Sequence, residues 1–444
     1  MSTPGPESVR AAVPAALRPP LVRLLEVADR RGIAVHLVGG PVRDLLLGRP
    51  LRDVDLVVEP TRGGEIGARE LAAEAAPAGA RIVSHDRFRT VTLEVGGAAL
   101  DLATVRAEQY PAPGALPVVR PGTLEEDLRR RDFTVNGLAL PLSRAARRGR
   151  PPLVDPGSGL RDLEARQLRI FHERSFHDDP TRALRAARLV PRLGFCVTRS
   201  TRAALRGALR DGAFAAVSGE RYRAELEKLF ADPSQGLDPA QALRLLHEWH
   251  VLAALEPGLG TPLEARVPLR RLGRMLADPP WPLLPLRPWL AGCMVWLAPL
   301  EAGLRRRTLR RLAVQGEPAR RVGRFPAERE RWLRKLARAR GRGPTDAALQ
   351  GVAEEELLAL VAWAPAGIRR RILRYASDDR HVSLPLGGED LVALGLSGPA
   401  VGRALARVRV AVLDRTVRSR QEALDLAREI ARRSRRRPAA RGRG

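Results

Sequence analysis

Residues 39–57 read GGPVRDLLLGRPLRDVDLV, and this stretch predicts the fold of the N-terminal part of the chain. An apolar run at 33–38 precedes the glycine pair and is expected to form a strand. Pro41 falls near the first position of a short helix, where proline is tolerated. The apolar residues at 54–58 predict a second strand. A strand, a glycine turn, a helix and another strand indicate an α/β domain.

Further elements of this domain lie on both sides of that stretch. A helix is expected at 21–31, ended by Gly32. Downstream we predict a helix at 66–76 and strands at 81–83, 90–95 and 98–104, with a glycine hairpin turn before the last. From about residue 160 strand patterns nearly vanish and helical periodicity dominates. The chain is therefore predicted to be an α/β N-terminal domain followed by mostly α-helical domains.

Asp53 and Asp55 form a candidate metal site. Residues two apart on a strand point to the same face, so these carboxylates are expected to lie side by side. Their mutual repulsion favours a bound cation, and Mg²⁺ takes one or two carboxylates together with substrate phosphates. Asp101, on the strand at 98–104, is either a third carboxylate of this site or an ordinary solvated strand residue.

The glycine turn before these carboxylates is a candidate phosphate site. Gly40 lets the backbone approach a phosphate closely, and the following helix offers unpaired N–H groups to it. Arg43 adds a charged fork to such a site, or else pairs with Asp44 or Asp53. A strand, a glycine turn and then a strand with carboxylates together indicate a site for phosphate and metal.

Charge points to a polyanionic partner. The chain has 77 Lys and Arg residues against 50 Asp and Glu residues, a net charge of +27, which favours nucleic acid.

Cys196 and Cys293 are the only cysteines, so no disulfide framework is possible. Residues 1–20 lack the pattern of a secretory signal, and the apolar stretch 289–300 is about half the length of a membrane span. We expect a cytoplasmic protein with no membrane association, and no motif calls for a protein partner.

Four segments resemble the motifs of one family, the class II tRNA nucleotidyltransferases and bacterial poly(A) polymerases, which belong to the DNA polymerase β superfamily. Besides residues 39–57, the matching segments are RRDFTVNGLA (130–139), DDPTRALRAARLVPRLGF (178–195) and SGERYRAELEKL (218–229). They occur in the family order and cover about residues 35–230. Asp178 stands where the family often has glutamate, and Gly137 where alanine is common.

The resemblance implies roles for particular residues. Asp53 and Asp55 would bind Mg²⁺, and Asp101 is the candidate third catalytic carboxylate. The nucleotide would be contacted by Gly40, Arg43, Arg131, Asp132, Asp179, Arg182, Arg185 and Arg188. The substrates would be CTP and ATP together with the 3′ end and acceptor arm of tRNA.

Asp179 and Arg182 are the candidate base-selecting pair. A carboxylate accepts a hydrogen bond from the exocyclic amine of cytosine or adenine, and an arginine donates to the neighbouring ring acceptors. Uracil and guanine present an oxygen there instead. The two residues are expected to be neighbours on one helix, whereas Arg188 lies about half a turn away from Asp179. Arg182 is thus predicted to read the base, while Arg185 or Arg188 contacts phosphates or braces the neck. Pro191 is expected to bend or end this helix.

The leading hypothesis is a tRNA 3′-end nucleotidyltransferase that adds C, A or both without a template. A poly(A) polymerase and a non-catalytic RNA-binding protein are the alternatives, and the motifs do not distinguish CCA, CC-only and A-only addition. The predicted domains are an N-terminal extension (1–20), a nucleotidyltransferase head (21–142), a neck with the nucleotide-selecting helix (143–232), a helical body (233–300), a basic helical RNA-binding tail (301–430) and a disordered basic C-terminus (431–444).

Overall fold

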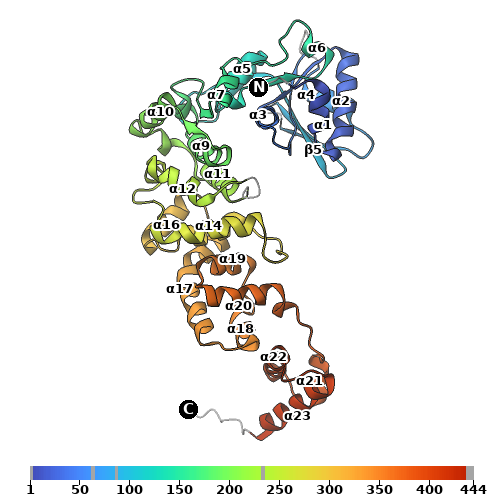
Figure 1. The fold of residues 1–444 in the computed structure, drawn as a ribbon, viewed down its shortest axis with the longest axis vertical. Helices are drawn as coiled ribbons and strands as arrows, with labels where there is room; N and C mark the ends of the chain where they lie inside the picture. Colours follow the sequence, from blue (N-terminus) through green and yellow to red (C-terminus); the bar gives the residue numbers. More distant parts are fainter. Residues whose placement is uncertain (1–3, 62–65, 86–88, 232–235, 437–444) are drawn as a thin grey trace. The chain divides into compact units, whose positions relative to one another are not determined.

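The computed structural model describes residues 4–61, 66–85, 89–231 and 236–436 (Figure 1). The chain divides into two compact units. Unit 1 comprises Met1–Tyr222 and Leu245–Pro257, and unit 2 comprises Arg223–Arg244 and Gly258–Gly444. All strands lie in unit 1, and the regular elements among the described residues of unit 2 are all helices. The predicted fold class, an α/β head followed by mostly helical domains, is therefore confirmed. The finer domain boundaries within each unit stay predictions.

A mixed six-stranded sheet forms the centre of the head, in the order β3-β4-β5-β2-β1-β8. β2 and β5 pair in parallel, and every other pairing in this sheet is antiparallel. The strands are β1 (Ala34–Val38), β2 (Asp55–Glu59), β3 (Arg81–His85), β4 (Thr90–Val95), β5 (Ala98–Thr104) and β8 (Ala139–Pro141). The predicted strands are all present. β8 was not expected, because its three residues give too short a pattern to recognise.

Helices cover this sheet. α2 (Arg18–Arg31) packs on α4 (Ala68–Ala75), and both contact strands of the sheet (Figure 1). α2 begins three residues before the predicted start at residue 21 and ends, as expected, at Gly32, whose φ of 66° suits glycine. α3 (Gly40–Leu46) follows β1 directly. These elements place the carboxylate strands and the glycine turn next to each other.

The segment around the predicted base-selecting helix is broken in two. α8 (Ser175–Asp178) ends before Asp179, whose backbone is extended, and α9 (Arg182–Leu193) starts three residues later. Asp179 and Arg182 are thus not neighbours on one helix, and that prediction is wrong. Pro180 supplies the reason, because a residue before proline is disfavoured in the helical region. Pro191 lies inside α9, and the helix continues past it to Leu193.

Unit 2 is built around apolar helices. α15 (Pro288–Leu297) is buried along almost its whole length and packs on α14 (Leu263–Ala277) and α19 (Glu354–Trp363). It corresponds to the apolar stretch expected to be a buried helix. No helix among the described residues is long and apolar enough to span a membrane.

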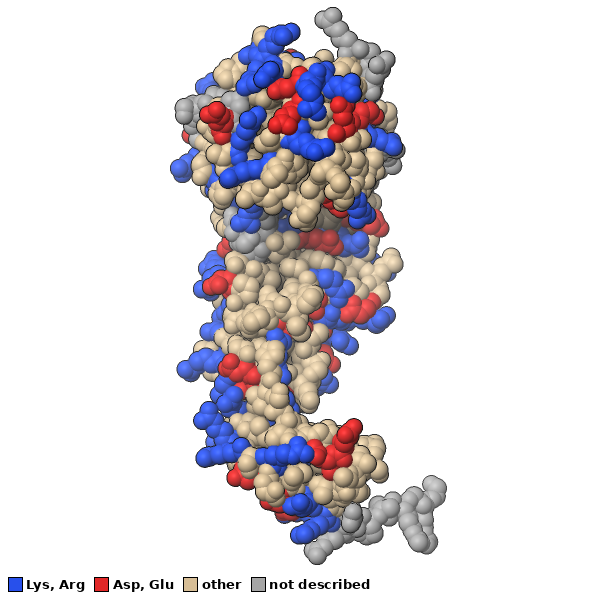
Figure 2. Space-filling view, turned by 90° about the vertical axis from the view of Figure 1, so that its right-hand side faces the viewer, with Lys and Arg blue, Asp and Glu red and all other residues tan. Residues whose placement is uncertain are grey.

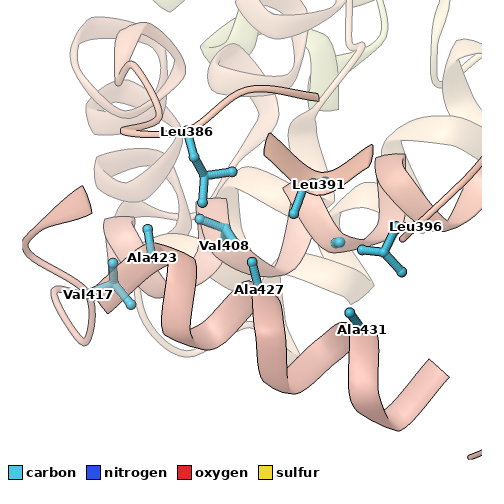
Figure 3. Close-up of a cluster of buried hydrophobic side chains, with 9 residues drawn as sticks. Leu386, Leu391, Leu396, Val408, Val417, Ala423, Ala427 and Ala431 are labelled. Carbon is cyan, nitrogen blue, oxygen red and sulfur yellow. The ribbon is translucent and has the colours of Figure 1, made fainter. Parts of the chain in front are cut away.

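The C-terminal helices enclose a small core of their own (Figure 3). α21 (Gly388–Ala393) and α22 (Pro399–Leu413) pack together, and α23 (Arg420–Arg436) lies against α22. Ala423, Ala427 and Ala431 of α23 are spaced four residues apart and enter this core. Residues 431–436, predicted to be disordered, are therefore helical. Residues 437–444 lie outside the described part of the chain.

Basic side chains are spread over the face of the molecule in Figure 2, with acidic side chains between them. Many arginines are engaged in ion pairs: Arg321, for example, is buried between Glu355 and Glu356 in unit 2. Part of the 77 basic side chains is thus neutralised locally by ion pairs, and the face in Figure 2 carries both signs of charge.

Candidate active site

A polar cavity of about 350 Å³ in unit 1 brings together most of the predicted site residues. Seven of them line it: Gly40, Asp55, Arg131, Asp132, Asp179, Arg182 and Arg185. Gly39, Glu108, Tyr110, Pro117, Arg130, Asn136 and Arg221 complete the wall. Four predicted residues, Asp53, Arg43, Asp101 and Arg188, do not line this cavity. The arrangement mixes cations for phosphates with carboxylates for amines or metal ions.

The carboxylates lie where two parallel strands run together. Asp55 is the first residue of β2, and its partner in the register is Asp101 on β5. Both line a smaller neighbouring cavity of about 330 Å³, next to Arg131. Asp101 accepts a hydrogen bond from Thr92 Oγ1 at 2.6 Å. Asp53 precedes β2 instead of starting it, so the expected same-face geometry of a single strand does not apply.

The surroundings of Asp55 disfavour the ionised form of its carboxyl group. The pKa of Asp55 is raised to about 6, mainly by burial and in addition by the neighbouring Asp101 and Asp53, although Arg131 and Arg43 act in the opposite direction. A cation bound among these carboxylates would remove that penalty, and hard oxygen ligands of this kind suit Mg²⁺. Among the described residues no group of three or more His, Cys, Asp or Glu side chains is close enough to form a complete ligand set. Phosphate oxygens would have to supply the remaining ligands.

The glycine turn is tightly packed against Arg131. Gly39 has a φ of 77°, and a Cβ at this position would lie 2.7 Å from Nη1 of Arg131. Arg43 is buried behind the cavity wall, where it donates to Asn136 Oδ1 at 2.5 Å and to Asp44 Oδ1 at 2.8 Å. The alternative that Arg43 pairs with Asp44 is therefore the observed one. Arg43 does not line the cavity itself, but its guanidinium lies beside two residues that do, Gly40 and Asn136.

Asp132 is a buried carboxylate with fixed partners. Its Oδ1 accepts from the backbone N–H of Phe133 at 2.9 Å and from Asn136 Nδ2 at 2.8 Å. Its Oδ2 lies 3.2 Å from Nε of Arg185. Burial opposes ionisation of Asp132, but Arg185 and the hydrogen bonds outweigh it and lower its pKa. Asp132 is thus ionised and rigid, and it orients Arg185 toward the cavity.

Asp179 and Arg182 are each anchored separately. Oδ1 of Asp179 accepts from Thr181 N at 3.0 Å, Thr181 Oγ1 at 2.6 Å and Arg221 Nη2 at 2.8 Å. Its Oδ2 receives no hydrogen bond from any described residue. Arg182 is buried and donates to Ser175 Oγ at 2.5 Å and to the carbonyl oxygen of Arg130 at 2.8 Å. Both side chains line the cavity without touching each other, so a base can reach the two independently.

Sequence reasoning missed one wall of the cavity. The hairpin of β6 (Arg106–Gln109) and β7 (Val118–Pro121) places Glu108 and Tyr110 there. Glu108 accepts from Arg130 Nη1 at 2.8 Å and from the Tyr110 hydroxyl at 3.1 Å. The alternating side chains of this segment were a usable signal, but nothing local shows which cavity it faces. Arg130 and Arg221 lie inside the motif segments quoted above, without an assigned role.

Comparison with known proteins decides the family. The model of the poly(A) polymerase head domain matches residues 35–169. The CC-adding tRNA nucleotidyltransferase of Deinococcus radiodurans is 36% identical over 428 residues, which cover 95% of this chain and 96% of that protein. The chain belongs to the tRNA nucleotidyltransferase family. The resemblance inferred from the motifs is therefore confirmed, as is the prediction that the protein is a nucleotidyltransferase.

Other members of the family are similar over most of this chain. An A-adding tRNA nucleotidyltransferase of Geobacter sulfurreducens is 31% identical over 91% of the chain, which spans 46% of that longer relative. The structure of the Thermotoga maritima CCA-adding enzyme complexed with tRNA has a TM-score of 0.68 and 26% identity, covering 95% of this chain and 97% of that one. The similarity includes both units, so the helical unit 2 belongs to the family architecture as well.

Proposed function

We propose that this protein adds cytidylates to the 3′ end of tRNA from CTP, with release of pyrophosphate and without a nucleic-acid template. The observation that carries the nucleotidyl transfer is the cavity in which carboxylates, arginines and the glycine turn converge. CC addition is favoured because the CC-adding relative is similar from end to end. The similarity to an A-adding relative over most of the chain makes A addition the second candidate.

The carboxylates are proposed to hold the metal and to receive the proton. Asp53 and Asp55 would bind Mg²⁺, which when bound neutralises charge on the triphosphate and the reacting hydroxyl. The 3′ oxygen of the RNA forms a bond to the α-phosphorus, the bond from that phosphorus to the bridging oxygen breaks, and pyrophosphate leaves. We assign the hydroxyl proton to Asp101, because it is the register partner of Asp55.

The cations are proposed to hold the triphosphate and ribose. Gly40 and Arg131 line the cavity beside Asp55 and would contact phosphates, since arginine matches phosphate with a bidentate fork. We assign the ribose contact to the fixed carboxylate of Asp132, which has Arg185 beside it. Arg43 acts indirectly by orienting Asn136. Arg188 does not line the cavity and is assigned a bracing role in α9.

Base selection is proposed to rest on Asp179 and Arg182. Oδ2 of Asp179 is the oxygen left to accept from an exocyclic amine, because Oδ1 is occupied by three donors. Arg182 donates to the ring acceptors beside that amine. A base with a carbonyl at that position would face a carboxylate oxygen and leave buried groups unpaired, which costs about 1–3 kcal/mol for each group. We further propose that the enzyme works in the cytoplasm, where its RNA substrate is.

One assay tests the function. Purified protein with Mg²⁺ is offered tRNA transcripts lacking the whole CCA end, the last two nucleotides or the terminal A, each with labelled CTP or ATP, and an unstructured RNA beside them. Addition of two cytidylates and then a stop is the expected result. Addition of A to a transcript ending in CC would favour the second candidate, and a complete CCA end would show both activities. Long adenosine tracts on the unstructured RNA would indicate poly(A) synthesis instead.

The control variant for this assay is Asp55→Asn. It keeps the size of the side chain but removes the charge that the metal requires. Transfer should fall to background while the protein still binds tRNA. If wild-type protein incorporates no nucleotide with any transcript, the proposed function is refuted and a binding-only role gains support.

A further inference from the structure

A second cavity of about 460 Å³ lies in unit 1, at the other end of α9 from the candidate active cavity. Val190 lines it, whereas Arg182 and Arg185 near the start of α9 line the first cavity. At 1.5 Å per residue, Arg185 and Val190 are roughly 7–8 Å apart along the helix axis. The second cavity is lined by Val190, Phe195, Cys196, Val197, Arg202, Leu205, Arg206, Leu245, Glu248, Trp249 and His250. Its volume is in the range of ligand-binding pockets.

The wall of this cavity contains flat and apolar side chains. Phe195 is buried, Trp249 is half-buried and Cys196 is exposed. Trp249 and His250 lie at the break between α12 (Pro239–Glu248) and α13 (Val251–Leu255). His250 has a φ of 62°, which is unusual for a residue other than glycine. Aromatic side chains of this kind stack on nucleobases regardless of sequence.

A row of cations borders the cavity on the neighbouring helix. α10 (Arg199–Arg210) carries arginines at 199, 202, 206 and 210, which we call the arginine ridge. Their spacing of three, four and four residues places them on one face of the helix. All four are exposed, and no side chain of the ridge makes a hydrogen bond or ion pair with any described residue. α10 contains no acidic residue that would offset their charge.

We propose that this cavity binds a nucleotide of the RNA substrate, with the base against Trp249 and the neighbouring phosphates along the arginine ridge. Arg202 and Arg206 line the cavity, so they are the ridge residues placed to contact the phosphates of that nucleotide. Like charges this close together repel one another, and a polyanion relieves the repulsion. Glu248 on the wall can accept from an amine of the base.

That the bound RNA is tRNA rests on the proposed function, whereas the cavity and its lining are observed independently of it. An acidic peptide would also satisfy the arginines, whereas it has no flat group to stack on Trp249. A nucleotide satisfies both features at once, and it explains why they occur side by side. The site is separate from the catalytic cavity, so it is expected to contribute to binding of the RNA and not to the chemical step.

Binding is tested first with the ridge. The double variant Arg202→Ala and Arg206→Ala is compared with Arg23→Ala and Arg30→Ala, two exposed arginines of α2 that have no partner among the described residues. Both variants lose two charges from unit 1. Fluorescence anisotropy measures the Kd for a tRNA transcript lacking the CCA end, in EDTA and at several salt concentrations. We expect the ridge variant to bind at least about tenfold more weakly, with a log–log salt slope reduced by about two. The control should change less than threefold.

The aromatic wall is tested through the cysteine that it contains. Cys196 is exposed, whereas Cys293 is buried and burial raises its pKa to about 12, so N-ethylmaleimide should label Cys196 first. The tRNA transcript should slow this labelling in the wild type and in Trp249→Phe, but much less in the ridge variant. Trp249→Leu should weaken binding about fivefold or more. Circular dichroism shows whether each variant is folded.

The possible outcomes are separable. If tRNA leaves the labelling of Cys196 unchanged and the ridge variant binds like its control, the proposed site is refuted. Protection by polyglutamate but not by tRNA would also refute it, in favour of an acidic peptide. A protein that is protected by tRNA but adds no nucleotide would contradict the proposed function and leave this site standing. Incorporation of CTP without protection of Cys196 by tRNA would support the proposed function and contradict this site.

Discussion

Replacement of Asp179 by asparagine should greatly weaken the preference of the enzyme for C and A over U and G. Three donors, two from Thr181 and one from Arg221, all converge on Oδ1 of Asp179. In Asp179→Asn the amide oxygen would take that position, because it is the only acceptor on the new side chain. The amide NH₂ would then replace Oδ2 in the cavity. The group that accepts from the exocyclic amine of C and A is thus replaced by one that donates to the carbonyl oxygen of U and G.

The expected size of the effect follows from the bonds exchanged. Cytosine loses a hydrogen bond to a charged group, worth about 1.5–3 kcal/mol, and uracil gains a neutral one, worth about 0.5–1.5 kcal/mol. The preference for CTP over UTP should therefore fall by about 2–4 kcal/mol, or roughly 30- to 1,000-fold. Single-turnover incorporation into a tRNA lacking its CCA end measures the ratio of kcat/KM for the two nucleotides.

Two control variants separate orientation from loss of the group. Asp179→Ala should weaken the preference for C less than Asp179→Asn does, since it presents neither an acceptor to cytosine nor a donor to uracil. Thr181→Val removes one anchoring donor and keeps the carboxylate, so C should remain preferred. A preference for CTP in Asp179→Asn as strong as in the wild type would refute the assignment of Oδ2 as the reading atom.

Three further predictions concern charge and stability. Asp55→Asn should abolish transfer in an incorporation assay yet leave the thermal unfolding temperature in EDTA unchanged or higher, because burial and neighbouring carboxylates make the charged form unfavourable, as its raised pKa of about 6 indicates. Arg321→Met should destabilise unit 2 by up to about 3–5 kcal/mol in urea unfolding, since it removes the buried cation between Glu355 and Glu356 and leaves them with the more exposed Arg287 and Arg324. For Glu59, burial opposes ionisation but hydrogen bonds from a histidine and an arginine lower the pKa to about 2. Its stabilisation is present above about pH 4.5 and lost as the pH falls toward 2, so Glu59→Gln should show a smaller loss of stability over that window in acid titrations.

The part of the site that the sequence predicted well depends on short-range pattern. Asp55 and Asp101 each stand in a clear apolar strand, and the parallel pairing of those strands brings them together. The glycine turn was predictable for the same reason, because the apolar residues at 33–38 before it indicate a strand. Apolar periodicity decides such elements, because it reflects burial on one side of a sheet.

The features of the site that the sequence analysis predicted wrongly or missed depend on a single proline and on long-range contacts. Asp179 and Arg182 fit a helical spacing, but Pro180 between them excludes a continuous helix at Asp179. That signal was available in the sequence. The ion pair of Arg221 with Asp179 joins residues 42 positions apart, and the place of Tyr110 in the wall depends on how a hairpin folds back. Neither has a local pattern that would reveal it.

Selection of a base without a template requires that the reading groups do not move. An unpaired polar group costs energy only if it cannot swing away to another partner, so discrimination depends on the anchors as much as on the reading atoms. Arg221 links Asp179 to the carbonyl oxygen of Gly114 in the β6–β7 connection, at 2.7 Å. Arg182 is tied to the carbonyl oxygen of Arg130. The proposed base-reading pair, Asp179 and Arg182, is therefore held by segments distant in the sequence. If the proposal is correct, loosening either anchor should weaken the choice of nucleotide before it weakens the transfer itself.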